Sequence, residues 1–406
     1  MSMDQPLHDH AGRFRDVEAA RAAHGADLVD RVIAGCFRAD PEADALVAAF
    51  RALPGGSGWQ LLEAALRDPV GPHAPAELRA LLEPVATLPA WVDPGRLHAG
   101  AVAYWRAGAA ALSLSLTCGS LAYGYQSASL SRPLAATGRL ERLAPRRLGE
   151  TARWVLSVTT PGGMLPGTQG FASSIRVRVV HALVRAHLLR EGGGWDTANW
   201  GLPLSASDAG STAMGGFLTM HLDAVHDLGV HYSRDELEDM THLWAWIATV
   251  MGVPAELAPP AYGEARRQVR AALAIDGGPD EDSARLMHAL LHHPVPLIQL
   301  LPGLAQGPAT ALNAHLLAGF TRRWMGHEMA DRLGVARTPL THAALLARPV
   351  SVLRGAVART GVLGNGERLG AVERAVVKRV LAQGKAARAP IAPEDAAAAP
   401  VLREVA

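Results

Sequence analysis

The sequence predicts an all-α protein, and three observations support this class. Apolar residues recur at intervals of three and four through most of the chain, which is the spacing of one helix face. No segment shows the apolar–polar alternation of a strand, and no repeat period emerges. No linker is long enough to demand separate domains. We therefore expect one large helical domain over residues 14–383, with a flexible N-terminus (residues 1–13) and an Ala/Pro-rich tail (residues 384–406).

Capping residues and Gly/Pro punctuation place the helices of the first half of the chain. Asp40 is a good N-cap and Pro41 fits the first helical turn, so a helix is expected over 42–52. The segments LPGGSG and DPVGPHAP break the periodicity after it. The other helices expected in this half are 17–38, 59–67, 76–82, 96–128 (one helix, or two broken near Gly119) and 142–158.

The second half is read in the same way. Ser233-x-x-Glu236 matches a capping box and opens a helix that Pro254 closes. The Gly- and Trp-rich loop 190–203 has no period of either kind. The other helices expected here are 175–190, 211–228, 262–274, 281–292, 307–333, 345–353 and 373–381.

Composition excludes several classes of function. The 39 basic residues nearly cancel the 38 acidic ones, so nothing favours nucleic acid as a partner. Cys36 and Cys118 form neither a disulfide framework nor the motif that attaches a c-type haem. The first residues lack an export signal, so a cytoplasmic protein is expected. The apolar stretch 107–125 is rich in Ala, Ser and Gly, which favours a closely packed central helix over a membrane span.

The segment 175–190 carries the most distinctive pattern. Arg178 and Arg185 lie three residues before and four residues after His181, so all three share one side of a helix. Imidazole, guanidinium and apolar groups together suit haem, which needs an axial nitrogen, apolar packing and cations near its propionates. The alternative is a core histidine flanked by arginines that pair with carboxylates. The apolar stripe around the histidine is Val177, His181, Val184 and Leu188.

The preceding helix presents a second polar group. Arg147, Thr151 and Trp154 share a face, and Glu150 lies at its edge. Such residues in an apolar interior are costly unless they are paired or functional, and a carboxylate there could exchange protons with a substrate. The alternative is that Arg147 and Glu150 pair with each other on the surface.

Other candidates carry weaker signals. Thr212 more often caps or packs than takes part in chemistry, and Phe217 more often belongs to a core. His288, His292 and His293 have a metal-like spacing without a completing carboxylate, which favours a solvated face. The glycine-rich segments follow no strand, so nucleotide binding is disfavoured, and no GxSxG elbow or recognisable cysteine nucleophile occurs.

Five segments together resemble the mpaB/rubber-oxygenase family, which includes the latex-clearing proteins. The resemblance covers roughly residues 46–257 well and the C-terminal helices more loosely. The combination of RxxHxxxR with the upstream RxxxT and the downstream W…WGxP carries it. The segments are LAATGRL (134–140), RRLGETARWV (146–155), RVRVVHALVR (176–185), WDTANWGLP (195–203) and ELEDMTHLWAWIATVMGVP (236–254).

The resemblance implies a non-covalent haem b in an all-helical fold with a globin-like core. His181 then matches the proximal iron ligand, and Arg178 and Arg185 match the arginines beside it. Arg147 and Thr151 match distal-side or structural residues. The further cofactor-pocket residues implied are Thr212 and Phe217, with Phe217 and apolar residues of 107–125 lining a substrate tunnel.

Two departures from the family pattern stand out. Glu150 occupies the position where latex-clearing proteins carry a distal lysine, so a lysine-capped iron is not expected. The acidic residue expected upstream has no clear counterpart, because Ser131 and Arg132 stand near that spacing and Glu141 lies well off it. Glu150 is therefore the candidate acid/base.

The resulting hypothesis is a haem b-dependent oxygenase that uses O2 to cleave a C=C bond of a small lipophilic isoprenoid-type substrate. The alternatives are a non-catalytic haem carrier or sensor, and a haem hydroxylase or peroxidase on the same fold. The oligomeric state is left open.

Overall fold

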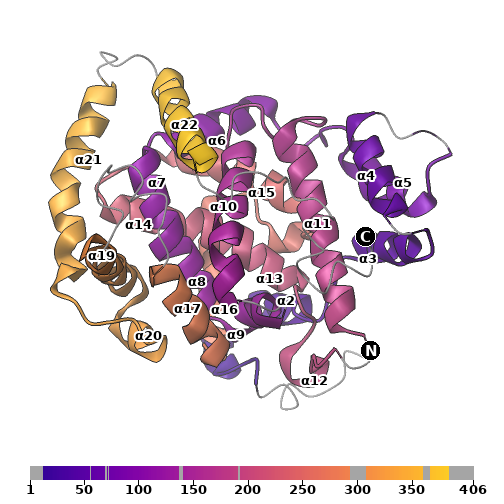
Figure 1. Cartoon of the computed structure of the whole chain (residues 1–406), viewed down its shortest axis with the longest axis horizontal. Helices are drawn as coiled ribbons and strands as arrows, with labels where there is room; N and C mark the ends of the chain where they lie inside the picture. The colour runs from indigo at the N-terminus through magenta and orange to yellow at the C-terminus, as the bar shows by residue number, and fades with distance from the viewer. Residues whose placement is uncertain are drawn as a thin grey trace.

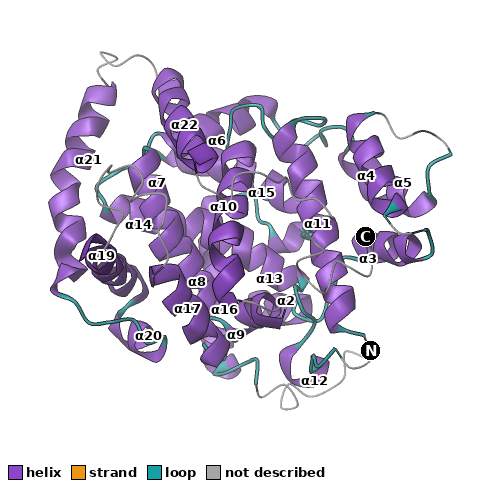
Figure 2. Ribbon diagram, viewed as in Figure 1, coloured by secondary structure: helices purple, strands orange, loops and turns teal. Residues whose placement is uncertain are grey.

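Helices supply all the regular structure in the part of the chain that the computed structural model describes. The described residues are 12–54, 56–68, 71, 73–136, 140–190, 193–292, 308–359 and 366–383. Within these ranges Figure 2 shows helices joined by loops, and the only extended pairing is an isolated bridge between Phe14 and Asp276. The all-α class is confirmed.

Most helices fall where the sequence predicts them. The α-helices are α1 (Val17–His24), α2 (Ala26–Gly35), α3 (Pro41–Arg51), α4 (Ser57–Arg67), α5 (Ala76–Leu82), α6 (Pro94–Trp105), α7 (Ala109–Ser115), α8 (Ala122–Tyr125), α9 (Ala128–Ala136), α10 (Leu140–Val158), α11 (Gln169–Leu188), α12 (Thr197–Trp200), α13 (Ala206–Gly210), α14 (His221–Asp227), α15 (Arg234–Val250), α16 (Tyr262–Ile275), α17 (Glu281–His292), α19 (Pro308–Met325), α20 (His327–Arg332), α21 (Ala343–Arg359) and α22 (Gly366–Gln383). Short 3-10 turns are η2 (Glu83–Val85), η5 (Ala255–Leu257) and η6 (Pro339–His342). Wider π-helical segments are η3 (Leu116–Leu121) and η4 (Ser211–Met220).

Three expected long helices are broken at glycines with positive φ. Gly25 (φ 93°) separates α1 from α2, and Gly326 (φ 90°) separates α19 from α20. The segment 96–128 is broken at Gly108 (φ 86°), which differs from both expectations, a single helix and a break near Gly119. A left-handed backbone cannot continue a right-handed helix, and glycine adopts it without steric cost. Gly119 instead lies inside the π-helical segment η3.

The core is built around α15, whose capping box is confirmed by reciprocal hydrogen bonds between Ser233 and Glu236. Trp244 and Trp246 on this helix are fully buried. Helix α6 packs closely along α15 because Gly100 has no side chain, and a Cβ there would lie 2.3 Å from the Asp239 carbonyl oxygen. Figure 1 places α15 behind α10 at the centre of the molecule.

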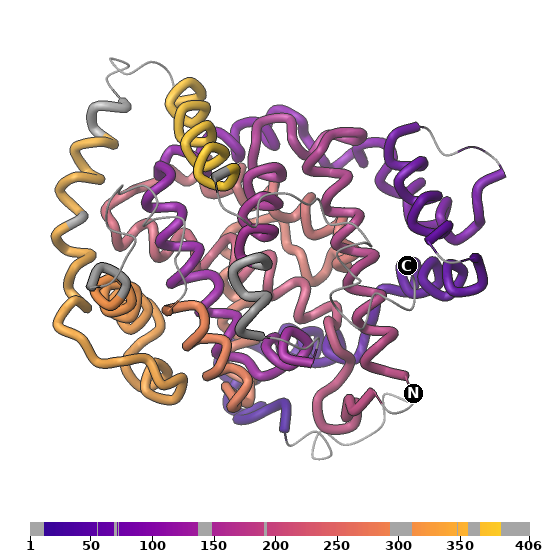
Figure 3. Tube along the Cα trace, viewed as in Figure 1, coloured from indigo at the N-terminus to yellow at the C-terminus, as the bar shows by residue number. Residues whose placement is uncertain are grey.

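The chain continues from this core to peripheral helices on both sides. Figure 3 shows α4 and α5 at one edge and α21 at the opposite edge. Segments η3 and α8 pack with α17 and α19 in a second apolar cluster, so the stretch 107–125 is internal, as expected. Among the helices of the described ranges, none combines the length and apolarity needed to cross a bilayer.

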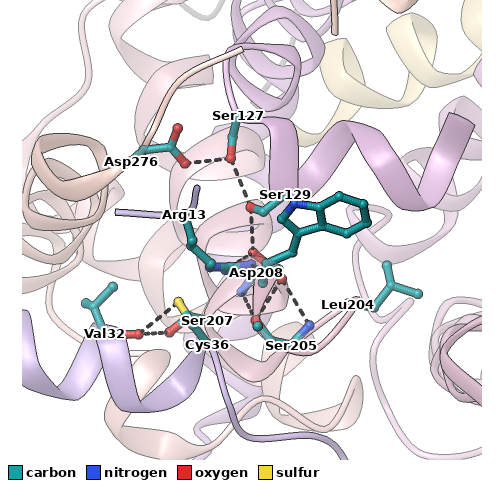
Figure 4. A network of polar contacts seen from close by, with 12 residues as sticks. Arg13, Val32, Cys36, Ser127, Ser129, Leu204, Ser205, Ser207, Asp208 and Asp276 are labelled. Carbon is teal, nitrogen blue, oxygen red and sulfur yellow. Dashed lines mark hydrogen bonds and ion pairs between the residues drawn. The ribbon is translucent and has the colours of Figure 1, made fainter. Parts of the chain in front are cut away.

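The N-terminal segment is fastened by a buried polar network (Figure 4). Arg13 donates to the Asp208 carboxylate at 2.7 Å and to the Trp200 carbonyl oxygen at 2.7 Å. Ser127 donates to Asp276 at 2.6 Å, and Ser129 donates to Asp208 at 3.1 Å. These groups line a small cavity of about 40 Å³, which is room for two or three waters. The network joins the N-terminal residues to elements nearly 200 positions later.

Candidate functional site

Helices α10 and α11 form the frame of the candidate site. They run antiparallel, because Trp154 and Ser157 of α10 contact Ser174 and Ser173 of α11 in reversed order. Trp154 donates to the Ser174 hydroxyl at 3.1 Å. Positions 147 and 151 lie on the same face of α10 as Trp154, so the register brings them level with the His181 turn of α11. Figure 3 shows the two helices side by side.

The His181 imidazole has a lowered pKa and makes no hydrogen bond to another described residue. Burial is the main cause that lowers its pKa to about 4, and the charge of Arg185 lowers it further, while Asp40 opposes the shift. Its side chain nevertheless keeps intermediate accessibility. Among the described residues its imidazole has no hydrogen-bond partner. At neutral pH the ring is therefore uncharged, with a nitrogen lone pair that no other side chain uses.

The two arginines beside His181 turn their guanidinium groups toward α3. Arg178 makes a two-pronged ion pair with Asp40, with distances of 2.6 and 2.7 Å. Arg185 pairs with Asp44 at 2.7 Å and donates to the Leu204 carbonyl oxygen at 2.9 Å. Both guanidinium groups are buried. This is the carboxylate pairing that the sequence left open, and its structural effect is to fix α11 against α3.

The polar residues of α10 are only partly described. Glu150 and Thr151 are both half-buried. The side chain of Arg147 lies outside the described residues, so its expected pairing with Glu150 is not tested. Helix periodicity places position 147 on the face of Thr151, which is the face that reaches α11.

Thr212 and Phe217 lie on η4. Thr212 is exposed, and its hydroxyl donates to the Asp208 carbonyl oxygen at 2.8 Å. Phe217 is buried and stacks on Trp244, with ring centroids 5.2 Å apart and planes 2° apart. These contacts are those of a threonine inside a helix, hydrogen-bonded to the carbonyl one turn back, and of a core phenylalanine. Their role in a cofactor pocket stays a prediction.

The sequence has no clear counterpart for the acidic residue that the family pattern places upstream of α10. Ser131, Arg132 and Glu141 are the residues nearest to that spacing. Ser131 is fully buried, and its hydroxyl has no hydrogen bond to any described residue. Arg132 pairs with Asp280 at 2.9 Å and lies over the Trp200 ring. The side chain of Glu141 lies outside the described residues. The structure therefore offers no replacement for that acid among the two described side chains.

The histidines near the end of α17 do not form a metal centre within the described chain. His288 and His292 are exposed and stack on each other at 4.0 Å. His293 lies outside the described residues. Nowhere in the described ranges do three or more His, Cys, Asp or Glu side chains gather in a metal-binding group.

Sequence reasoning missed an aromatic cluster behind α10. The rings of Trp154 and Trp244 lie 5.9 Å apart, and Tyr104 lies 6.0 Å from Trp244. Tyr104 also stacks on His221 at 4.7 Å. Burial lowers the pKa of His221 to about 3, and its Nδ1 lies 2.8 Å from the Ser115 hydroxyl. No local signal joins these residues, because they come from four separate helices.

These features define a class of all-helical proteins with an uncharged, half-buried histidine on one of two antiparallel helices. Residues 96–359 match the family model described as "ER-bound oxygenase mpaB/B'/Rubber oxygenase, catalytic domain". The chain belongs to this family. The family match starts at residue 96, whereas the resemblance seen in the sequence starts near residue 46, and the match extends through the C-terminal helices to residue 359.

Two further comparisons agree with the family. The chain is 25% identical over 277 residues to the rubber oxygenase of Streptomyces sp. (strain K30), across 66% of this chain and 62% of that relative. It therefore matches less than two thirds of that relative's length. The structure of latex clearing protein in the closed state superimposes with a TM-score of 0.62 at 20% identity, covering 88% of this chain and 94% of that one. The second likeness shows the fold alone.

Proposed function

We propose that the protein is a haem b-dependent oxygenase that cleaves a C=C bond of a lipophilic isoprenoid-type substrate with O2. Membership of an oxygenase family supports the reaction type, and the rubber oxygenase relative supports the substrate class. We further propose that residues 14–383 form the haem-binding domain.

One observation carries the proposal. The His181 ring is surrounded by protein, has no hydrogen-bond partner among the described residues and keeps accessible surface. A structural core histidine normally hydrogen-bonds through its ring nitrogens. A neutral imidazole with an unused lone pair would instead be able to hold haem iron through its nitrogen. The residues present therefore fit the group that the family implies.

The protein's own residues would divide the work as follows. His181 would hold the iron, and the ion pairs of Arg178 and Arg185 with α3 would fix the position of α11. Position 147 and Thr151 would orient the reacting groups from α10, across from the His181 helix α11. Glu150 would accept or donate a proton at its carboxylate oxygens. When bound, haem would supply the O2 chemistry, and the surrounding apolar core would exclude water.

The direct test is an absorption spectrum of the purified protein with haem supplied. We expect a Soret band in the wild type and its loss or a large shift in His181→Ala. His187→Ala is the matched control, since it removes a histidine from the same helix six residues later and should leave the band in place. A colourless wild type, or an unchanged band in His181→Ala, would refute the cofactor assignment.

Oxygen consumption and product analysis separate the remaining alternatives. A Soret band with no O2 uptake on any terpenoid would indicate a carrier or sensor. Hydroxylated or peroxide-dependent products without chain cleavage would indicate a hydroxylase or peroxidase on the same fold. Carbonyl products from a cleaved double bond are the outcome we expect.

A further inference from the structure

The aromatic cluster behind α10 contains an unusual set of unsatisfied polar atoms. Among the described residues, the hydroxyl of Tyr104, the indole N–H of Trp244 and Nε2 of His221 are buried without a hydrogen-bond partner. The Tyr232 hydroxyl likewise has none in the described part of the chain, and the Arg106 guanidinium lies over its ring at 4.6 Å. Buried polar atoms are nearly always hydrogen-bonded, so a cluster of exceptions calls for a functional explanation, redox chemistry among them.

The rings of this cluster form a continuous path. Trp154 lies 5.9 Å from Trp244, and Phe217 contacts both, at 5.3 and 5.2 Å. Tyr104 follows 6.0 Å beyond Trp244. These centroid separations are those of aromatic rings in van der Waals contact. Indole and phenol are the most readily oxidised side chains of the path. The two indoles, those of Trp154 and Trp244, therefore lie next to each other in it.

The path begins beside the candidate cofactor site. Trp154 donates its indole N–H to Ser174, which is seven residues before His181 on α11. Seven residues span about 10 Å along a helix and return to nearly the same face. Trp154 is half-buried, while Trp244 is fully buried. An electron could therefore pass in short steps from Trp244 to Trp154, and from there to the face of α10 that packs against α11, the helix of His181.

We propose that Trp154 and Trp244 are one-electron donors to the cofactor site, and that through them the protein reduces hydrogen peroxide. The proposal rests on haem binding at His181, as proposed above. One hydrogen peroxide takes up two electrons and two protons and gives two waters. Each indole supplies one electron, solvent supplies the protons, and an external one-electron reductant such as ascorbate restores the indoles.

The hydrogen bonding indicates where the oxidised state rests. Oxidation of a phenol normally releases its proton, but the Tyr104 hydroxyl has no acceptor among the described residues, and burial raises its pKa well above the usual value. An indole can lose an electron and keep its N–H proton, and no described residue accepts a hydrogen bond from the Trp244 N–H. The radical should therefore reside on tryptophan, with Tyr104 still reduced.

The test is electron paramagnetic resonance of the haem-loaded protein, frozen within a second of adding one equivalent of hydrogen peroxide. We expect an organic radical whose spectrum narrows when tryptophan is ring-deuterated and stays unchanged when tyrosine is. Trp244→Phe should reduce the signal about twofold, because Trp154 still supplies its electron, and replacing both indoles with Phe should reduce it at least tenfold. Trp91→Phe is the matched control, because Trp91 is 45% exposed and contacts Trp246, which is not part of this path.

The outcomes separate this proposal from the cofactor assignment. A missing Soret band would overturn both. An intact Soret band and consumed peroxide with no radical, or a radical that follows tyrosine labelling or Trp91, would overturn the relay alone. If Trp244→Phe does not fold, Trp154→Phe and the labelled wild type still decide, since Phe at position 154 keeps an aromatic ring beside Phe217 and Trp244 and loses the hydrogen bond to Ser174.

Discussion

The buried imidazole of His221 should make the protein sensitive to mild acid. Its side chain is fully buried, and burial lowers its pKa from 6.5 to about 3. In the unfolded chain the ring regains its ordinary pKa and takes up a proton below pH 6.5, whereas the folded protein does not. The stabilising contribution is therefore complete above pH 6.5 and is lost progressively as the pH falls toward 3.

The magnitude follows from the two pKa values. At pH 5.0 the unfolded state gains about 2 kcal/mol relative to the folded state from this one group, which is roughly a thirty-fold change in the unfolding equilibrium. His221→Gln removes the titrating ring. The variant should be less stable than the wild type at pH 7.5, because a buried packed ring is lost, but should lose about 2 kcal/mol less between pH 7.5 and 5.0.

Urea unfolding at pH 7.5, 6.0 and 5.0, followed by circular dichroism, measures this difference. His226→Gln is the control, because it removes an exposed histidine from the same helix α14. Parallel pH profiles for wild type and His221→Gln would show that the ring is not held neutral by burial.

Three further outcomes are expected. Asp40→Asn keeps an N-cap but removes the charge that faces the buried Arg178, and should cost about 3 kcal/mol of unfolding free energy. Glu42→Gln should cost under about 0.5 kcal/mol, because the Glu42 side chain is 46% exposed. Gly100→Ala should cost about 3 kcal/mol by forcing α6 away from α15, measured as a lower urea midpoint; an unchanged midpoint would contradict the close approach. Because its pKa is about 4, the His181 ring of the haem-free protein should be about nine-tenths neutral at pH 5, as measured by NMR titration of the imidazole; a midpoint near 6.5 would contradict the lowered pKa.

Local signals predicted the helices well and their interruptions less well. Asp40 and Ser233 begin helices as their side chains dictate, because capping depends on residues within one turn. The break at Gly108 and the π-helical turns of η4 were not predictable in the same way. A glycine tolerates either backbone hand, and a π-helix keeps the same apolar spacing pattern, so packing from elsewhere decides both.

The site shows the same limit. The sequence placed His181 and its two arginines on one side of a helix, and the structure does so too. It could not name Asp40 and Asp44 as the arginines' partners, because about 140 positions separate each pair. The environment of Trp244 likewise depends on helices distant in the chain. Contacts of this range arise from tertiary packing, which leaves no local signature.

The buried ion pair of Arg13 has a consequence for how the chain folds during its synthesis. Its guanidinium pairs with Asp208, and the backbone beside it pairs with residues 275–277. Residue 13 leaves the ribosome well before these partners, which emerge some 200 to 260 residues later. At 5–20 residues per second the arginine waits for roughly ten seconds or more without its carboxylate. This segment is therefore secured long after its synthesis, and nascent chains stopped before residue 276 should be readily cleaved near Arg13 by proteases.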